Sequence, residues 1–131
     1  MEINTHQAID PALCGRPLSV GQGCSRVRLT ASQAMAADDT GLVHGGFIFG
    51  LADYAAMIAI NQPNVVLGAA DVKFLKPMRV DQTVVADAKV EEVQGIKYWV
   101  AVSVTREEGE DIIFQGMFTC FVPERHVLGR S

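Results

Sequence analysis

One stretch of the chain, from His44 to about Asn61, predicts a helix that is apolar on nearly every side. Asp53 is the one charged residue within it. A helix without a polar face has to be enclosed by the rest of the fold rather than lie on its surface. Asn61-Gln62-Pro63-Asn64 is a stop signal that ends it. The stretch therefore predicts a central helix that other elements cover.

Strands and tight turns account for most of the remaining chain. Apolar residues that alternate with polar ones predict strands, and short turns between them imply antiparallel hairpins. The expected strands cover residues 25–31, 66–74, 84–91, 98–104 and 111–122. One long helix with four or five antiparallel strands indicates an α+β domain whose sheet curves around the helix.

The length of 131 residues fits a single domain over residues 1–131, with an irregular or partly helical lead-in over about 1–17. Such a small domain leaves sheet edges unpaired, and pairing them across a dimer is one solution.

Composition argues against several classes of protein. The net charge of −4 gives no basic field to recruit nucleic acid or an anionic membrane. The longest apolar run falls short of the roughly 20 residues that cross a bilayer. Residues 1–11 lack the features of a signal peptide, so we expect a cytoplasmic protein. Three cysteines without a C-x-x-C spacing and three histidines predict no disulfide framework, no metal and no separate cofactor.

Asp53 and the start of the helix are the candidate chemistry. Burying an unpaired carboxylate costs several kcal/mol or raises its pKa, so Asp53 is expected to have a use. Gly45 and Gly46 begin the helix, where backbone N–H groups lack acceptors and no side chain blocks a ligand oxygen. Such donors stabilise the oxyanion of acyl transfer, with Asp53 as nucleophile or as the base that activates water. His44 could contact substrate, orient the helix start or cap it.

The spacing of these groups favours a site shared between two subunits. Gly45 and Asp53 are eight residues apart, which is roughly 12 Å along one helix. Both would have to lie about 3 Å from one carbonyl group. Two antiparallel helices from two protomers can achieve this, so we expect a homodimer.

Other residues are expected to lie around the substrate. Tyr54 and Met57 are expected in the core or in the pocket wall. Lys73, Lys76 and Arg79 either form a solvated sheet edge or bind the phosphates of a nucleotide-like carrier.

The motif from Gly41 to Gly46, followed by Leu51-Ala52-Asp53 and by Val72 to Pro77, resembles the PaaI-like branch of the hotdog-fold acyl-CoA thioesterases. The resemblance covers about residues 18–122. It implies a hotdog fold, in which a five-stranded antiparallel sheet wraps around one long helix. It also implies homodimers that often pair into tetramers.

The same resemblance implies roles for the candidate residues. The Gly45 amide would polarise the thioester carbonyl, and Asp53 of the other subunit would attack it or activate water. His44 would help to shape the site, and coenzyme A would be part of the substrate. Asp38 stands where relatives often have Asn or Gln, and Met57 stands where many have Ser or Thr.

Three functions are compatible with these residues. The first is hydrolysis of an acyl-CoA to free acid and coenzyme A. The second is a non-catalytic module that binds acyl-CoA in the same pocket. The third is a hydratase on the same fold, which the arrangement of Asp38, Asp39 and His44 matches poorly.

Overall fold

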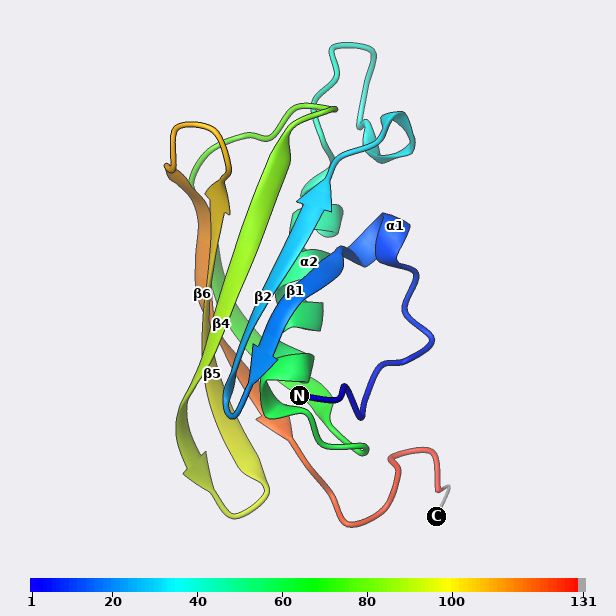
Figure 1. The fold of residues 1–131 in the computed structure, drawn as a ribbon, viewed down its shortest axis with the longest axis vertical. Helices are drawn as coiled ribbons and strands as arrows, with labels where there is room; N and C mark the ends of the chain where they lie inside the picture. The colour runs from blue at the N-terminus through cyan, green and yellow to red at the C-terminus, as the bar shows by residue number, and fades with distance from the viewer. Residues whose placement is uncertain (130–131) are drawn as a thin grey trace.

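The structure is a computed structural model that describes residues 1–129. One long helix, α2, lies against a single curved antiparallel sheet, and a short helix packs beside α2 on the side away from the sheet (Figure 1). The elements in chain order are α1 (Pro11–Cys14), β1 (Arg16–Gly21), β2 (Cys24–Thr30), a 3-10 turn (Gln33–Met35), α2 (Gly45–Ile60), β3 (Val66–Phe74), β4 (Thr83–Gln94), β5 (Lys97–Arg106) and β6 (Ile112–Phe121).

The strand order across the sheet is β1-β2-β4-β5-β6-β3, and every neighbouring pair is antiparallel. The predicted α+β architecture is confirmed. The sheet has six strands rather than the predicted five, because β1 forms within and just after the expected irregular lead-in. Pro17 and the bulge beside it obscure its alternation, and proline is tolerated there because β1 is an edge strand.

The helix α2 is enclosed, as its apolar surface predicts. Ten of its residues are buried, and they face mainly β2, β4 and β5. The Ser25 hydroxyl of β2 donates a 2.7 Å hydrogen bond to the Ala55 carbonyl, which ties the sheet to the helix. Among residues 1–129, no helix is long and apolar enough to cross a membrane.

The chain turns sharply after α2 and holds both terminal segments there. Asn61 adopts a left-handed conformation (φ 56°), which ends the helix. Its side chain accepts from the Asn4 amide and donates to the Glu2 carbonyl, each at 2.6 Å. The Asn64 side chain donates to the carbonyls of Pro123 and Glu124. Both ends of the described chain therefore lie near the C-terminal end of α2.

The β3 strand is the second edge of the sheet, and α2 covers it little. Most of its residues are exposed, including the ring of Phe74, and it carries no proline. Asp71 and Lys73 lie on the outer face of the sheet, so Val72 and Phe74 point to the face that carries α2. An apolar, uncovered edge strand is a natural surface for pairing with another chain.

Candidate functional site

The segment that leads into α2 is held by backbone hydrogen bonds to the loop after β3. The Val43 amide donates to the Met78 carbonyl, and the Val80 amide donates to the Gly41 carbonyl. The His44 amide donates to the Met35 carbonyl at 2.9 Å. These bonds fix the position of the first turn of α2.

The first two amides of α2 are free donors. Within residues 1–129, neither the Gly45 nor the Gly46 amide donates a hydrogen bond. The exposed His44 imidazole makes no capping bond and folds back over Gly46, where an added Cβ would lie 3.1 Å from its Nε2. The glycine at 46 therefore gives the imidazole room, and the donors at the positive end of the helix stay available for an oxygen ligand.

Asp53 lies two turns further along α2, among apolar groups. Its Oδ1 atom is buried and has no hydrogen-bond partner within the described residues. Burial raises the pKa of this carboxyl group to about 6. The charge of Asp53 also contributes to raising the pKa values of Cys14 and Cys120, after the larger effect of their own burial, so both thiols lie near it. A carboxylate in this state is poised to exchange a proton near neutral pH.

A hollow of about 310 Å³ adjoins the start of α2. Val43, Ile48 and Met78 are buried beneath it, and Gly45 lies at its edge. Its remaining lining comes from the chain that leaves β3, which is Phe74, Leu75, Lys76 and Pro77. This apolar lining next to free amides fits a ligand with an apolar group beside a carbonyl.

Three other residues predicted to contact substrate, Asp38, Tyr54 and Met57, do not line the hollow beside Gly45. Asp38 is exposed, and its carboxylate accepts hydrogen bonds from the Thr40 amide and hydroxyl, which lowers its pKa. Met57 is fully buried in the core, and Tyr54 is 8% exposed with its pKa raised by burial. Neither Tyr54 nor Met57 lines the hollow beside Gly45.

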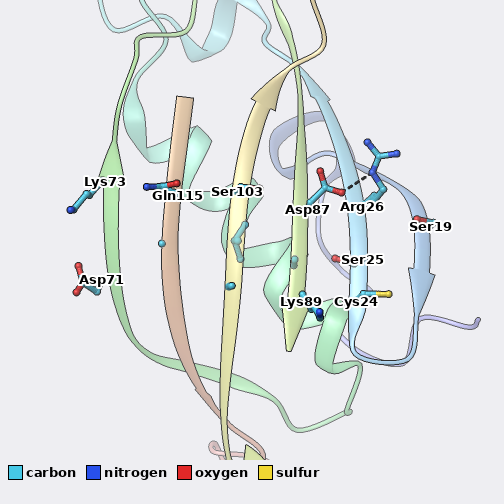
Figure 2. Close-up of a pocket in the computed structure, with 14 residues that line it drawn as sticks. Ser19, Cys24, Ser25, Arg26, Asp71, Lys73, Asp87, Lys89, Ser103 and Gln115 are labelled. Carbon is cyan, nitrogen blue, oxygen red and sulfur yellow. Dashed lines mark hydrogen bonds and ion pairs between the residues drawn. The ribbon is translucent and has the colours of Figure 1, made fainter. Parts of the chain in front are cut away.

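The three basic residues do not face one common hollow. Lys76 lines the hollow by Gly45, and Arg79 pairs with Leu42 in the segment that leads into α2. Lys73 instead lines one edge of a trough of about 800 Å³ on the outer face of the sheet. Figure 2 shows this trough, with Lys73 on one side and the ion pair of Arg26 with Asp87 (2.7 Å) on the other. The trough lies on the face opposite α2, so it is separate from Asp53 and Gly45.

Sequence reasoning missed the groups that shape the rim of the hollow by Gly45. Phe74 falls in a predicted strand and in the family motif, and neither indicates that its exposed ring contacts the helix start. Arg106 ends β5 and Asp111 lies in the turn just before β6, and together they hold the Lys76–Pro77 segment. The run of basic and acidic residues around the acidic turn was the available signal, but it is equally typical of a solvated hairpin.

Comparisons with known proteins identify the family. The model of the Thioesterase superfamily matches residues 40–113, which contain the helix start and Asp53. The chain belongs to this superfamily, and the hotdog fold and the PaaI-like resemblance are confirmed.

Solved structures support the same fold. An uncharacterized protein from Pyrococcus horikoshii is 48% identical, with a TM-score of 0.94 over 98% of this chain and 97% of that one. The PaaI protein of E. coli, from the phenylacetic acid degradation operon, is 21% identical, with a TM-score of 0.79 over 90% and 86%. A hypothetical thioesterase from Streptococcus pneumoniae TIGR4, solved with coenzyme A, is 19% identical, with a TM-score of 0.75 over 88% of each chain.

The curated relatives are longer proteins. A methylthioribose-1-phosphate isomerase of Aquifex aeolicus is 49% identical over 93% of this chain, which spans 26% of that protein. A transcription factor FapR of Caldanaerobacter subterraneus is 33% identical over 68% of this chain and 44% of that protein. The chain thus spans about a quarter of the length of the isomerase and under half of the length of the transcription factor.

Proposed function

We propose that this protein hydrolyses an acyl-CoA thioester to a free acid and coenzyme A. The observation that carries the proposal is that one helix holds free amides at Gly45 and Gly46 and, two turns later, the Asp53 carboxylate, whose Oδ1 atom is buried and unpartnered within the described residues. Membership of the Thioesterase superfamily supports the reaction class. The solved thioesterase with coenzyme A supports the carrier.

The chemistry assigns one role to each group. The thioester oxygen accepts a hydrogen bond from the Gly45 amide, which stabilises the oxyanion. In the first route, Asp53 takes a proton from a water molecule while the water oxygen adds to the carbonyl carbon. In the second route, an Asp53 carboxylate oxygen adds to the carbonyl carbon and gives an anhydride, which water then cleaves. In both routes the C–S bond breaks, and the thiolate of coenzyme A leaves and takes up a proton. His44, over Gly46, borders the carbonyl site.

A homodimer would complete this site. Within residues 1–129 the outer edge of β3 is unpaired, and Val72 and Phe74 extend its apolar inner face beyond α2. Pairing of β3 with its copy would extend the sheet across the two subunits. It would bring a second α2 alongside the first, with Asp53 of one protomer near Gly45 of the other. A dimer of dimers is proposed on the family resemblance alone.

The remaining residues are proposed to contact the substrate around this centre. Lys76, which lines the hollow by Gly45, and Arg79, whose backbone pairs with Leu42, are proposed to bind phosphates of coenzyme A. Lys73 would reach the same carrier only at the edge of the sheet. Asp38, Tyr54 and Met57 stay proposed as supports of the loop and of the pocket wall.

A hydrolysis assay tests the proposal. Purified protein is given a panel of acyl-CoA thioesters, and the released thiol is measured for the parent, Asp53→Asn and Asp87→Asn. Asp53→Asn should lower kcat by at least about 100-fold because it removes the base or nucleophile. Asp87→Asn alters an exposed carboxylate on the opposite face and should leave kcat unchanged. An Asp53→Asn variant as fast as the parent would refute the assignment.

A non-catalytic acyl-CoA-binding module is the second candidate. The likeness to the transcription factor FapR favours it, because a regulator of transcription uses this fold in part of its chain. Acyl-CoA binding by the parent without release of thiol from any thioester of the panel would establish this function instead.

A further inference from the structure

The ring of Phe74 stands over the first residue of α2. A Cβ placed on Gly45 would lie 3.3 Å from its Cε2 atom and 3.6 Å from its Cδ2 atom. The ring packs edge-on against Phe114, with the centroids 5.0 Å apart and the planes at 77°. Although it is the last residue of a strand, Phe74 is 52% exposed. An aromatic ring beside free backbone donors borders whatever those donors bind.

The backbone below this ring is firmly held. The amides of Leu75 and Lys76 both donate to the Ile113 carbonyl, at 2.8 and 3.2 Å. Arg106 donates to the Pro77 carbonyl and to Asp111, which also accepts from the Lys76 ammonium. Because this backbone is fixed, the width of the opening to the hollow beside Gly45 depends on the size of the side chain at position 74.

The hollow that Phe74 borders is small. Its volume of about 310 Å³ is at the low end of the range for ligand pockets. Val43, Ile48 and Met78 close its inner side and are at most 4% exposed. An acyl chain cannot extend further inward, so its size is limited between this wall and the ring.

We propose that Phe74 is a specificity-determining residue that restricts the substrate to short, slim acyl groups. This inference rests on the proposed function. When the thioester carbonyl accepts a hydrogen bond from the Gly45 amide, the first carbons of the acyl group lie next to the ring. A branched, aromatic or long acyl group meets the ring, and removing the ring opens the site to it.

Three variants test the proposal. Phe74→Ala widens the opening, Phe74→Trp narrows it, and Ile112→Ala truncates an exposed apolar residue that does not line the hollow. The value of kcat/KM is measured for acetyl-, butyryl-, hexanoyl-, benzoyl- and dodecanoyl-CoA, and thermal unfolding confirms that each variant folds. Phe74→Leu replaces Phe74→Ala if the latter does not fold.

The parent should prefer the short thioesters. Phe74→Ala should raise the ratio of kcat/KM for large over small acyl groups by about tenfold or more, the scale of one or two methylene groups in an apolar pocket. Phe74→Trp should lower that ratio, and Ile112→Ala should leave it unchanged. A parent that prefers dodecanoyl-CoA, or a Phe74→Ala variant that slows all substrates equally, would overturn the inference.

Failure of the proposed function gives a different result. If the parent hydrolyses none of the thioesters, the Kd values of the same five compounds are measured instead. The same change in their ratio would then support Phe74 as the residue that selects the bound acyl group. An unchanged ratio would refute it.

Discussion

Gly45 opens α2 and Asp53 lies on the same unbroken helix two turns later, so the two residues are separated by roughly 12 Å of helical rise within one protomer. One carbonyl group is therefore expected to reach the Gly45 amide of one protomer and the Asp53 carboxylate of another. The proposed site therefore needs two subunits, and experiments on dimers of mixed subunits can test this.

The Gly45 amide is testable without disturbing the helix. Gly45 is the first helical residue, where proline is favoured, and His44 already has the extended backbone that a following proline requires (ψ 130°). Gly45→Pro should therefore fold, yet lower kcat by about 100-fold or more because it lacks the N–H group. Gly45→Ala adds the same Cβ beside Phe74 but keeps the N–H, so it is the matched control. Equal kcat values for the two variants would refute the role of the amide.

Complementation tests whether the site is shared. When Gly45→Pro and Asp53→Asn chains are mixed and refolded together, about half of the dimers carry one chain of each kind, and each of these has one intact site. We expect recovery of about a quarter of the parent activity, since half of the dimers have half of their sites. Each variant alone should be inactive. Absence of recovery from a mixture that sedimentation shows to be dimeric would place both groups in one protomer.

The pH profile should report the Asp53 carboxyl group. Its pKa is raised to about 6 by burial, and the carboxylate is the reactive form in either route. The value of kcat/KM should be level above pH 7 and should fall about tenfold per pH unit below pH 6. Stopped assays with a buffer series from pH 4.5 to 8.5 measure it. A profile that breaks near pH 4 would mean that the reacting carboxyl group is exposed to water.

The ionisation of Asp53 should also affect stability: activity rises as this carboxyl group loses its proton, whereas the free energy of unfolding falls. The pKa of Asp53 in the folded protein, about 6, lies above the ordinary value of 3.8, so the folded protein binds more protons than the unfolded chain between these pH values. The free energy of unfolding is therefore reduced as the pH rises from about 4 to 6. Asp53→Asn should remove this loss and be more stable than the parent at pH 8, by at most about 3 kcal/mol.

Urea unfolding at pH 8 and at pH 3.5 measures the difference. At pH 3.5 the carboxyl group is largely protonated in both states, so the two proteins should unfold at nearly the same urea concentration. A variant less stable than the parent at pH 8 would mean that Asp53 has a stabilising partner in solution.

The pattern of apolar residues along the sequence predicted most of the fold, because the fold is determined mainly by which residues are buried. The enclosed helix and its end at Asn61 follow from an apolar surface and a stop signal, and five strands follow from alternation. The strand β1 escaped because Pro17 interrupts it. The bulge at Gly68 in β3 also has no signal in alternation, since the extra residue shifts the later side chains to the other face.

The candidate site was predictable only where chemistry marks the residue. A carboxylate on an apolar helix and glycines at a helix start stand out in a sequence. The contact of Phe74 with Gly45 depends on how a strand end packs against a helix start. The bond from Arg106 to the Pro77 carbonyl likewise joins segments far apart in the chain, so neither contact has a local pattern.

The asparagines after α2 have a consequence for how this domain combines with others. Asn61 and Asn64 fasten the first and last segments beside the C-terminal end of the helix, and Gly45 lies at the other end. A protein fused to either terminus would attach far from the free amides and leave their approach open. This domain could therefore be joined to other domains in a longer polypeptide without a change in the positions of Gly45 and Asp53.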